Sequence, residues 1–171
     1  MNLTFQDPQS IKNWKTVDDD VMGGVSASQI EWIDEDTEES ENSGLLRFSG
    51  AVSLKNNGGF CSTRTTGTIW DLSKNKGLKL RLRSDGRGYQ FTLRCPSIPD
   101  GASFRAPLGV DRNGWTTITV PFDDMNLWRR GKLLSTEKTI DRNSVESIGF
   151  LLADGKPGPF ALDVAWVQSY R

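Results

Sequence analysis

The densest group of chemically capable side chains lies near the start of the chain, where residues 18–26 are DDDVMGGVS. Three carboxylates beside two glycines could bind calcium, because calcium prefers oxygen ligands. The spacing differs from that of an EF-hand loop, which alternates its acids and ends on a glutamate. Two further interpretations are a tight turn, in which Asp18 and Asp20 cap backbone amides or pair with arginine, and a ligand or partner contact that includes Met22. We expect no metal site here.

A second group consists of basic residues in two runs that alternate with apolar residues. Residues 78–83 are LKLRLR and residues 89–94 are YQFTLR, with DGRG at 85–88 between them. Such alternation predicts strands with one apolar face. The glycines between the runs predict a hairpin that pairs Leu82 with Phe91.

The polar face of this hairpin would carry Arg81, Arg83 and Arg94, and Arg64 is expected on the same face. Lys79 would lie opposite Arg94, and such like charges cost stability unless an anion lies between them. These bases either pair with acids inside the protein or line a shallow groove. A groove of this kind suits an anionic or polar ligand, such as a sugar or a partner's carboxylate.

Two more candidate binding residues lie in turns. Asn57 begins NGGF at 57–60, which lies between strand-like runs and predicts a hairpin turn rather than a nucleotide-binding loop. Trp128 lies in the polar segment 126–131, where it either closes the end of a sandwich or forms an exposed anchor. The candidate binding residues are Asp18, Asp20, Met22, Asn57, Arg64, Arg81, Arg83, Arg94 and Trp128.

The composition narrows the function classes. The chain has no histidine, which excludes Ser-His-Asp and Cys-His catalysis and zinc sites that contain histidine. The paired acids Asp123 and Asp124 lack a second carboxylate at a fixed spacing, as a glycosidase would need. A net charge of −1 does not favour nucleic acid. We therefore predict a protein without enzymatic activity, without a cofactor and without a nucleic-acid partner.

Cysteine use and hydropathy suggest a location. Cys61 and Cys95 fit no disulfide framework and no metal spacing. No signal peptide or membrane span is visible, so a cytoplasmic protein with reduced thiols is expected. Residues 34–43 hold six acids and no base, which predicts a solvated loop, with docking as the alternative.

Strand-like runs dominate the whole chain and few segments are helical. An all-β fold is expected, a jelly-roll sandwich of two antiparallel sheets in one domain over residues 1–171. Short helices are expected at 8–14, capped by Asp7, and near 141–145. The expected strands cover 25–33, 45–54, 60–65, 78–83, 89–94, 115–120, 147–153 and 160–170.

Taken in order, these motifs resemble the complex I intermediate-associated protein 30 family. The matching pieces are Trp14 with 17–26, 48–50 with Leu54, 57–60 with Ser62 and Arg64, 77–83, 85–87 with Tyr89, Trp115 with 120–122, 128–131, 148–153 and 158–160. The resemblance implies a galactose-binding-domain-like jelly roll and kinship with a factor that assists assembly of respiratory complex I. It implies a non-catalytic, chaperone-like binding or scaffolding module, whose partner is a protein such as a membrane-complex subunit or assembly intermediate. Other proteins with this fold bind carbohydrates, so a carbohydrate-binding domain is the alternative.

Overall fold

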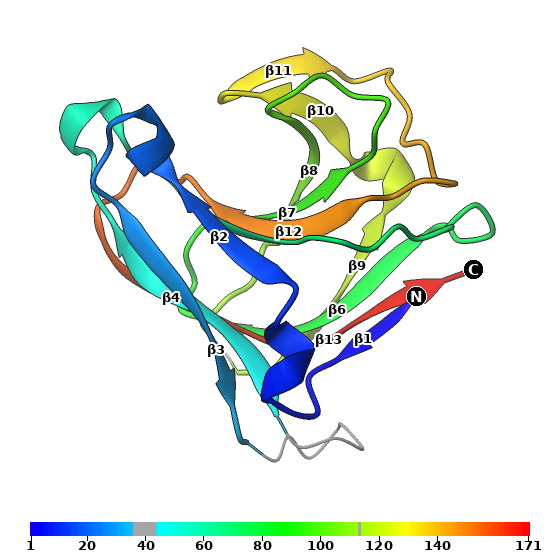
Figure 1. The fold of residues 1–171 in the computed structure, drawn as a ribbon, viewed down its shortest axis with the longest axis horizontal. Coiled ribbons are helices and arrows are strands. Elements are labelled where there is room, and N and C mark those ends of the chain that lie inside the picture. Colours follow the sequence, from blue (N-terminus) through cyan, green and yellow to red (C-terminus); the bar gives the residue numbers. More distant parts are fainter. Residues whose placement is uncertain (36–43, 113) are drawn as a thin grey trace.

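The computed structural model describes residues 1–35, 44–112 and 114–171. Their strands form two antiparallel sheets that pack face to face (Figure 1), which confirms the predicted all-β sandwich. The six-stranded sheet has the order β3 (Ala27–Ile33), β4 (Leu45–Val52), β13 (Gly158–Tyr170), β6 (Gly77–Ser84) and β9 (Thr116–Pro121), with β1 (Asn2–Thr4) also beside β13.

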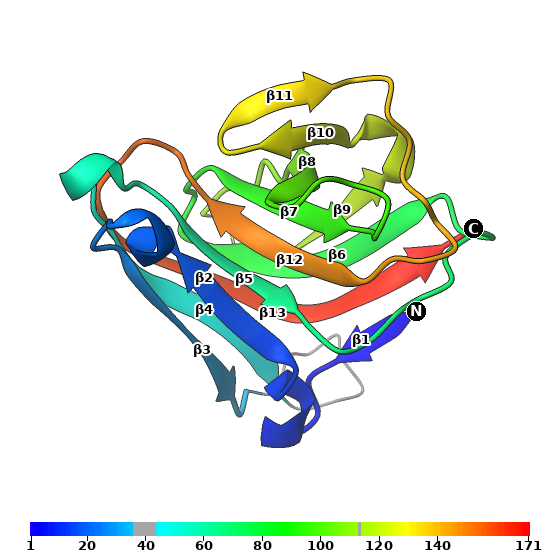
Figure 2. The same ribbon diagram turned by 45° about the horizontal axis from the view of Figure 1, so that its top comes forward.

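The seven-stranded sheet carries the features that matter for function. Its order is β11 (Lys132–Ser135), β10 (Asn126–Arg129), β8 (Ala102–Pro107), β7 (Tyr89–Arg94), β12 (Ser147–Leu152), β5 (Cys61–Thr65) and β2 (Trp14–Asp18). Figure 2 shows these strands side by side above the other sheet. One face therefore packs on the core and the other faces outward.

Side-chain alternation explains why the core lies between the sheets. Leu80 on β6 and Phe91 on β7 are fully buried, as are Phe104 on β8 and Phe150 on β12. The ring of Phe150 lies 5.8 Å from that of Phe91 and 6.0 Å from that of Trp14. Each buried side chain alternates with one on the opposite face of its strand, so the outer face of the seven-stranded sheet is left for polar residues.

The predicted pairing of residues 78–83 with 89–94 is wrong, although both runs are strands. β6 pairs with β13 and β9 in the six-stranded sheet, whereas β7 pairs with β12 and β8 in the other. Leu82 therefore lies beside Val164 and Thr116, and Phe91 beside Phe150 and Ala106. The turn at 85–88 carries the chain from one sheet to the other. The turn at 57–60 does the same between β4 and β5, so it is not a hairpin turn.

The predicted helices are shorter than expected. Asp7 does cap the first, accepting hydrogen bonds from Gln9 and Ser10, but the helix is a single 3-10 turn, η1 (Pro8–Ile11). Residues 141–145 form a hydrogen-bonded turn instead of a helix. Further 3-10 turns are η2 (Asp19–Met22), η3 (Lys55–Asn57) and η4 (Phe122–Asp124). Among the described residues, no helix is long and apolar enough to span a bilayer.

The acidic run at 34–43 lies outside the described residues from 36 onward. Of its first two residues, Glu35 pairs with Arg83 on β6 at 2.8 Å.

Candidate binding groove

The outer face of the seven-stranded sheet is hollowed into a groove of about 520 Å³. Figure 1 shows β10 and β11 rising along one side of it, and η2 and η3 along the other. We call it the basic groove. The residues that line it are Val17, Val21, Met22, Asn57, Gly58, Gly59, Phe60, Ser62, Thr63, Arg64, Thr92, Arg94, Gly101, Ser103, Arg105, Arg130, Gly131, Leu151 and Ala153.

Strand register places three arginines on the floor of the basic groove. Arg64 on β5 pairs with Gly149 on β12, Gly149 pairs with Thr92 on β7, and Thr92 pairs with Arg105 on β8. These four residues form one row across the sheet. Arg94 lies two residues after Thr92 on the same strand and so shares its face. Because Gly149 has no side chain, the row is open in the middle.

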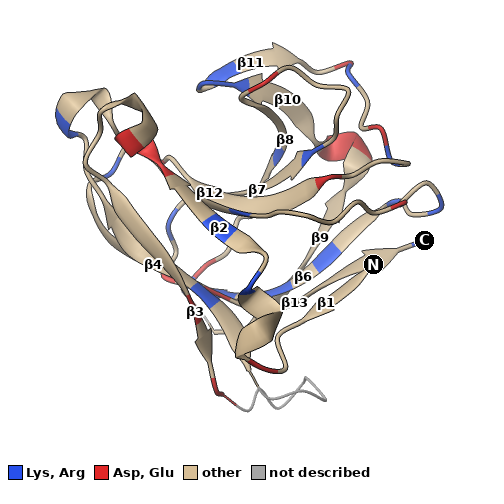
Figure 3. Ribbon diagram, in the orientation of Figure 1, with Lys and Arg blue, Asp and Glu red and all other residues tan. Residues whose placement is uncertain are grey.

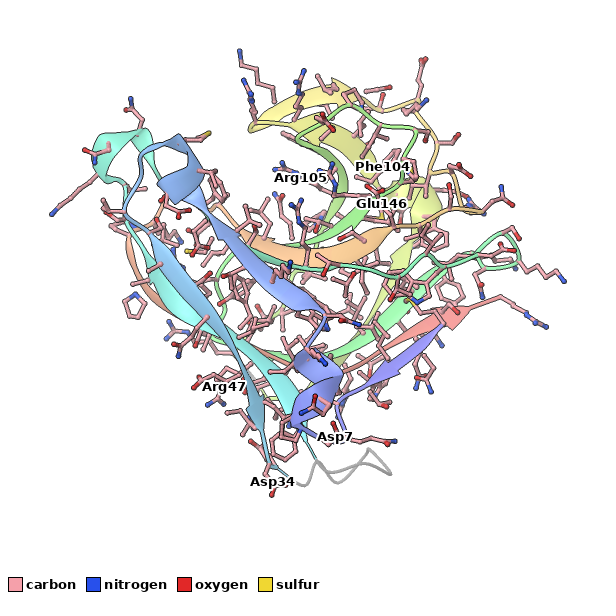
Figure 4. All side chains as sticks on the ribbon, viewed as in Figure 1. Asp7, Asp34, Arg47, Phe104, Arg105 and Glu146 are labelled. Atoms are coloured by element: carbon pink, nitrogen blue, oxygen red, sulfur yellow. The ribbon has the colours of Figure 1, made fainter. Side chains whose placement is uncertain are left out.

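Few acids balance these arginines. Arg94 donates to the carbonyl of Ala102 and lies 3.8 Å from Glu146, a long and partly exposed ion pair. Arg105 donates to the Ser103 hydroxyl at 3.0 Å. Within residues 1–35, 44–112 and 114–171, no carboxylate lies at ion-pair distance from Arg64 or Arg105. Figure 4 shows Arg105 reaching from β8 into the space between the two sides of the groove.

The electrostatics of the groove floor disfavour unpaired positive charge. Burial lowers the pKa of Arg64 and the nearby charge of Arg94 lowers it further, while the charge of Glu146 offsets part of this shift. Burial also lowers the pKa of Arg105. Figure 3 shows further basic positions around the groove, on β2 and at the turn between β10 and β11. The groove therefore favours an anionic ligand, which would offset both the lost hydration and the repulsion.

The rim formed by η2 and the 57–60 turn is held together by Asp19. This carboxylate is fully buried and accepts hydrogen bonds from the Ser26 amide at 2.9 Å, the Ser26 hydroxyl, the Gly59 amide at 2.6 Å and the Phe60 amide at 3.3 Å. Burial raises the pKa of Asp19, but these hydrogen bonds outweigh it, so the pKa lies below its ordinary value. One charged group thus joins the two glycine-containing motifs.

Two positions near Asp19 require glycine, because their backbones pass too close to the Asp19 carboxylate for a side chain. A Cβ added at Gly24 would lie 2.2 Å from one Asp19 carboxylate oxygen, and one at Gly58 would lie 2.5 Å from the other. Gly23 ends η2 at φ 88°, which favours glycine. The DDDVMGGVS and NGGF motifs are therefore parts of one structure that presents Val21 and Met22 at the groove.

Asp18 and Asp20 serve the backbone rather than the arginines. Asp18 accepts from the Ser28 amide at 2.7 Å and the Ser28 hydroxyl at 2.6 Å, which fastens β2 to β3. The exposed Asp20 accepts from the Val21 amide at 2.9 Å. Among the described residues, no group of three or more His, Cys, Asp or Glu side chains could hold a metal ion. The turn interpretation of these acids is the one the geometry matches.

Arg81 and Arg83 lie on β6 in the other sheet, because β6 and β7 do not pair. Arg83 binds Asp163 at 2.7 Å and Glu35 at 2.8 Å, and its guanidinium lies 4.7 Å from the Trp115 ring centre. Arg81 donates to the Thr117 hydroxyl at 3.3 Å. The structure therefore separates these two from Arg64 and Arg94.

The remaining sequence candidates lie at or near the groove. Met22 and Asn57 line its rim, and the side chain of Met22 is 58% exposed. Trp128 on β10 is half-buried and pairs with the groove residue Ser103, but it does not line the groove itself. The sequence reasoning missed Asp19 and Arg105. The alternation of buried Ala102, Phe104 and Ala106 with Ser103 and Arg105 was the signal for β8.

Comparison with solved structures places the fold among carbohydrate-binding modules. A family 11 module from Clostridium thermocellum, solved with a beta-1,3-1,4-mixed-linked tetrasaccharide, matches with a TM-score of 0.68 and 18% identity over 99% of this chain and 96% of that one. A family 30 module of a cellulosomal cellulase from the same organism matches with a TM-score of 0.59 and 14% identity over 99% and 98% of the two chains. At these identities the likeness shows the fold alone, and it confirms the jelly roll.

Comparison with curated proteins finds relatives that are not named as carbohydrate-binding modules. The complex I intermediate-associated protein 30, mitochondrial, of Neurospora crassa is 25% identical over 94% of this chain and 69% of its own length. The Mus musculus protein of the same name is 26% identical over 57% of this chain, but only 31% of its own length is covered. These relatives are named as mitochondrial, which overturns the prediction of a cytoplasmic protein.

The family model for complex I intermediate-associated protein 30 matches residues 3–164, nearly the whole chain. The resemblance expected from the sequence is thereby confirmed, and the chain belongs to the complex I intermediate-associated protein 30 family.

Proposed function

We propose that this chain is a non-catalytic binding module that holds a protein partner, an intermediate in the assembly of respiratory complex I, in the basic groove. The observation that carries the proposal is the group of arginines on the groove floor, near which the described residues place one acid, the partly exposed Glu146. Membership of the family supplies the class of partner. A scaffold of this kind needs a shaped, charged surface and no reacting group.

Site-specific photo-cross-linking tests this assignment. A photoreactive amino acid replaces Met22, which is exposed at the groove rim, or Thr119, which is exposed on β9 in the opposite sheet. Each variant is irradiated with detergent-solubilised membranes from the source cells, and the adducts are identified by mass spectrometry. We expect subunits of complex I or of its assembly intermediates from position 22 and none from position 119. Equal labelling from both positions, or no such subunit from position 22, would contradict the proposal.

Carbohydrate binding is the second candidate function, because a module of the same fold has been solved in complex with a tetrasaccharide. Two features of the groove disfavour it. A neutral sugar would cover the partly buried Arg64 and Arg105 without supplying a counter-charge. Phe60 is the one aromatic residue in the groove lining among the described residues, so little ring surface is offered to a sugar. Calorimetric titration with the mixed-linked tetrasaccharide should show no heat of binding, and saturable binding that Arg64→Gln abolishes would favour this alternative.

A further inference from the structure

The spacing of the groove arginines sets the shape of the anion they can bind. Arg64 and Arg105 lie in one row on β5 and β8, with β12 and β7 between them. Neighbouring strands are about 4.8 Å apart, so three spacings place the two arginines about 14 Å apart across the sheet. A ligand that carries at least two separated negative charges matches this backbone separation, with one charge over each arginine.

An extended peptide matches this separation. Such a chain rises about 3.3 Å per residue with side chains on alternate sides, so residues i and i+4 are about 13 Å apart on one face. A segment that crosses the strands would place these two acids over Arg64 and Arg105. The acid at i+2 would then lie within reach of the Arg94 guanidinium, because Arg94 is on β7 between them.

The rim beside the arginines is apolar. Val21 is 68% exposed and Met22 58% exposed, and both line the groove. Methionine adapts to varied apolar surfaces and is enriched in protein interfaces. A peptide can present an apolar side chain next to its carboxylates, whereas an acidic polysaccharide cannot. The combination of an apolar rim and a cationic floor therefore favours a peptide ligand.

We infer that the basic groove binds an extended acidic segment of the partner protein, with acids at alternate positions over Arg64, Arg94 and Arg105 and an apolar side chain on Val21 and Met22. This inference rests on the proposed function and specifies its partner. The recognition is electrostatic on the floor and hydrophobic at the rim, and the two contributions can be measured separately.

Fluorescence anisotropy with synthetic peptides tests the inference on the intact protein. The probe is a labelled peptide with three glutamates at alternate positions followed by a leucine, and the matched peptide has glutamines instead. We expect the glutamine peptide to bind at least tenfold more weakly than the glutamate peptide. Added salt should lower the affinity of the glutamate peptide and leave that of the glutamine peptide unchanged. Equal affinity of the two peptides, or no binding of either, would overturn the inference whether or not any protein variant folds.

Protein variants locate the contacts. Arg64→Gln and Arg105→Gln should each weaken the glutamate peptide about tenfold, whereas Lys79→Gln, which removes one charge from the opposite sheet, should leave it unchanged. Met22→Gln should lower the affinity for the glutamate peptide that ends in leucine. It should not change the affinity for the same peptide with alanine in place of the leucine. Equal losses from Arg64→Gln and Lys79→Gln would overturn the inference, as would tetragalacturonate binding more tightly than the peptide.

The cross-linking and peptide experiments can refute the proposed function and the acidic-segment inference independently of each other. Cross-links from position 22 to a complex I subunit, together with equal affinity for both peptides, would retain the proposed function and remove the acidic segment. Selective peptide binding without those cross-links would retain the acidic specificity and remove the assembly partner.

Discussion

Replacing Asp19 with asparagine should destabilise the protein strongly, because this buried carboxylate joins η2 to the 57–60 turn. One Asp19 oxygen accepts from the Ser26 hydroxyl and the amides of Gly59 and Phe60, and the other accepts from the Ser26 amide. If the asparagine oxygen keeps the first three bonds, its NH₂ group must face the Ser26 N–H. Three charge-assisted bonds then become neutral and one buried donor loses its acceptor.

The cost follows from these losses. Each of the three bonds weakens by about 1 kcal/mol and the unpaired amide costs about 1–3 kcal/mol, so we expect a loss of about 4–6 kcal/mol. With a urea dependence of about 2 kcal/mol per molar, the unfolding midpoint should fall by about 2–3 M. Asp20→Asn is the control, because Asp20 is exposed and makes one local bond to the Val21 amide. Its free energy of unfolding should change by no more than about 0.5 kcal/mol.

The difference in stability between the Asp19→Asn and Asp20→Asn variants should also depend on pH. The pKa of Asp19 in the folded state lies below its ordinary value of 3.8, so the carboxylate contributes its full stability above that value. The contribution is lost as the pH falls through the lower, folded-state pKa. Urea unfolding of both variants at neutral pH and at acid pH measures this. A variant Asp19→Asn as stable as Asp20→Asn, or a difference unchanged at acid pH, would refute the role assigned to Asp19.

Three further predictions concern parts of the fold away from the groove floor. Asp163→Asn should lower stability by about 2–4 kcal/mol in urea unfolding without changing peptide affinity, because it leaves Arg83 with one acid fewer on the opposite sheet. Gly58→Ala should cost about 1–3 kcal/mol by the same measurement, because its Cβ would meet the fixed Asp19 carboxylate at 2.5 Å; an unchanged midpoint would contradict this. Burial raises the pKa of Cys61 to about 12, so at pH 8 this thiol should react with a disulfide reagent only after unfolding, as mass spectrometry of the labelled peptide would show.

Alternation predicted the strands well but could not predict their partners. The runs at 78–83 and 89–94 each have one buried apolar face, as the sequence indicates. Both faces point into the same core, however, from opposite sheets. A short glycine-containing link is equally compatible with a hairpin and with a crossing between sheets. The pairing of β6 with β13 depends on contacts across about eighty residues of chain, which local pattern does not encode.

The candidate site was predicted in part for the same reason. Arg64 and Arg94 were placed on one face because each follows the alternation of its own strand, and the structure does bring them together. Arg81 and Arg83 were included only through the incorrect hairpin. Arg105 was missed because no strand was predicted over residues 102–107, a segment that follows Gly101 and ends on a proline.

The acidic motif at 18–26 and the arginines of the groove floor have different roles, because their polar groups make different bonds. The acids of the DDDVMGGVS motif direct their oxygens to backbone amides and serine hydroxyls, so the motif builds the rim. Arg64, by contrast, makes no ion pair within the described residues, and its removal should leave the fold's own bonds intact. Substitutions at the rim motif should therefore change stability, whereas substitutions of the floor arginines should change which partner is bound. The fold can thus keep one architecture while the charges on its groove floor determine what that architecture recognises.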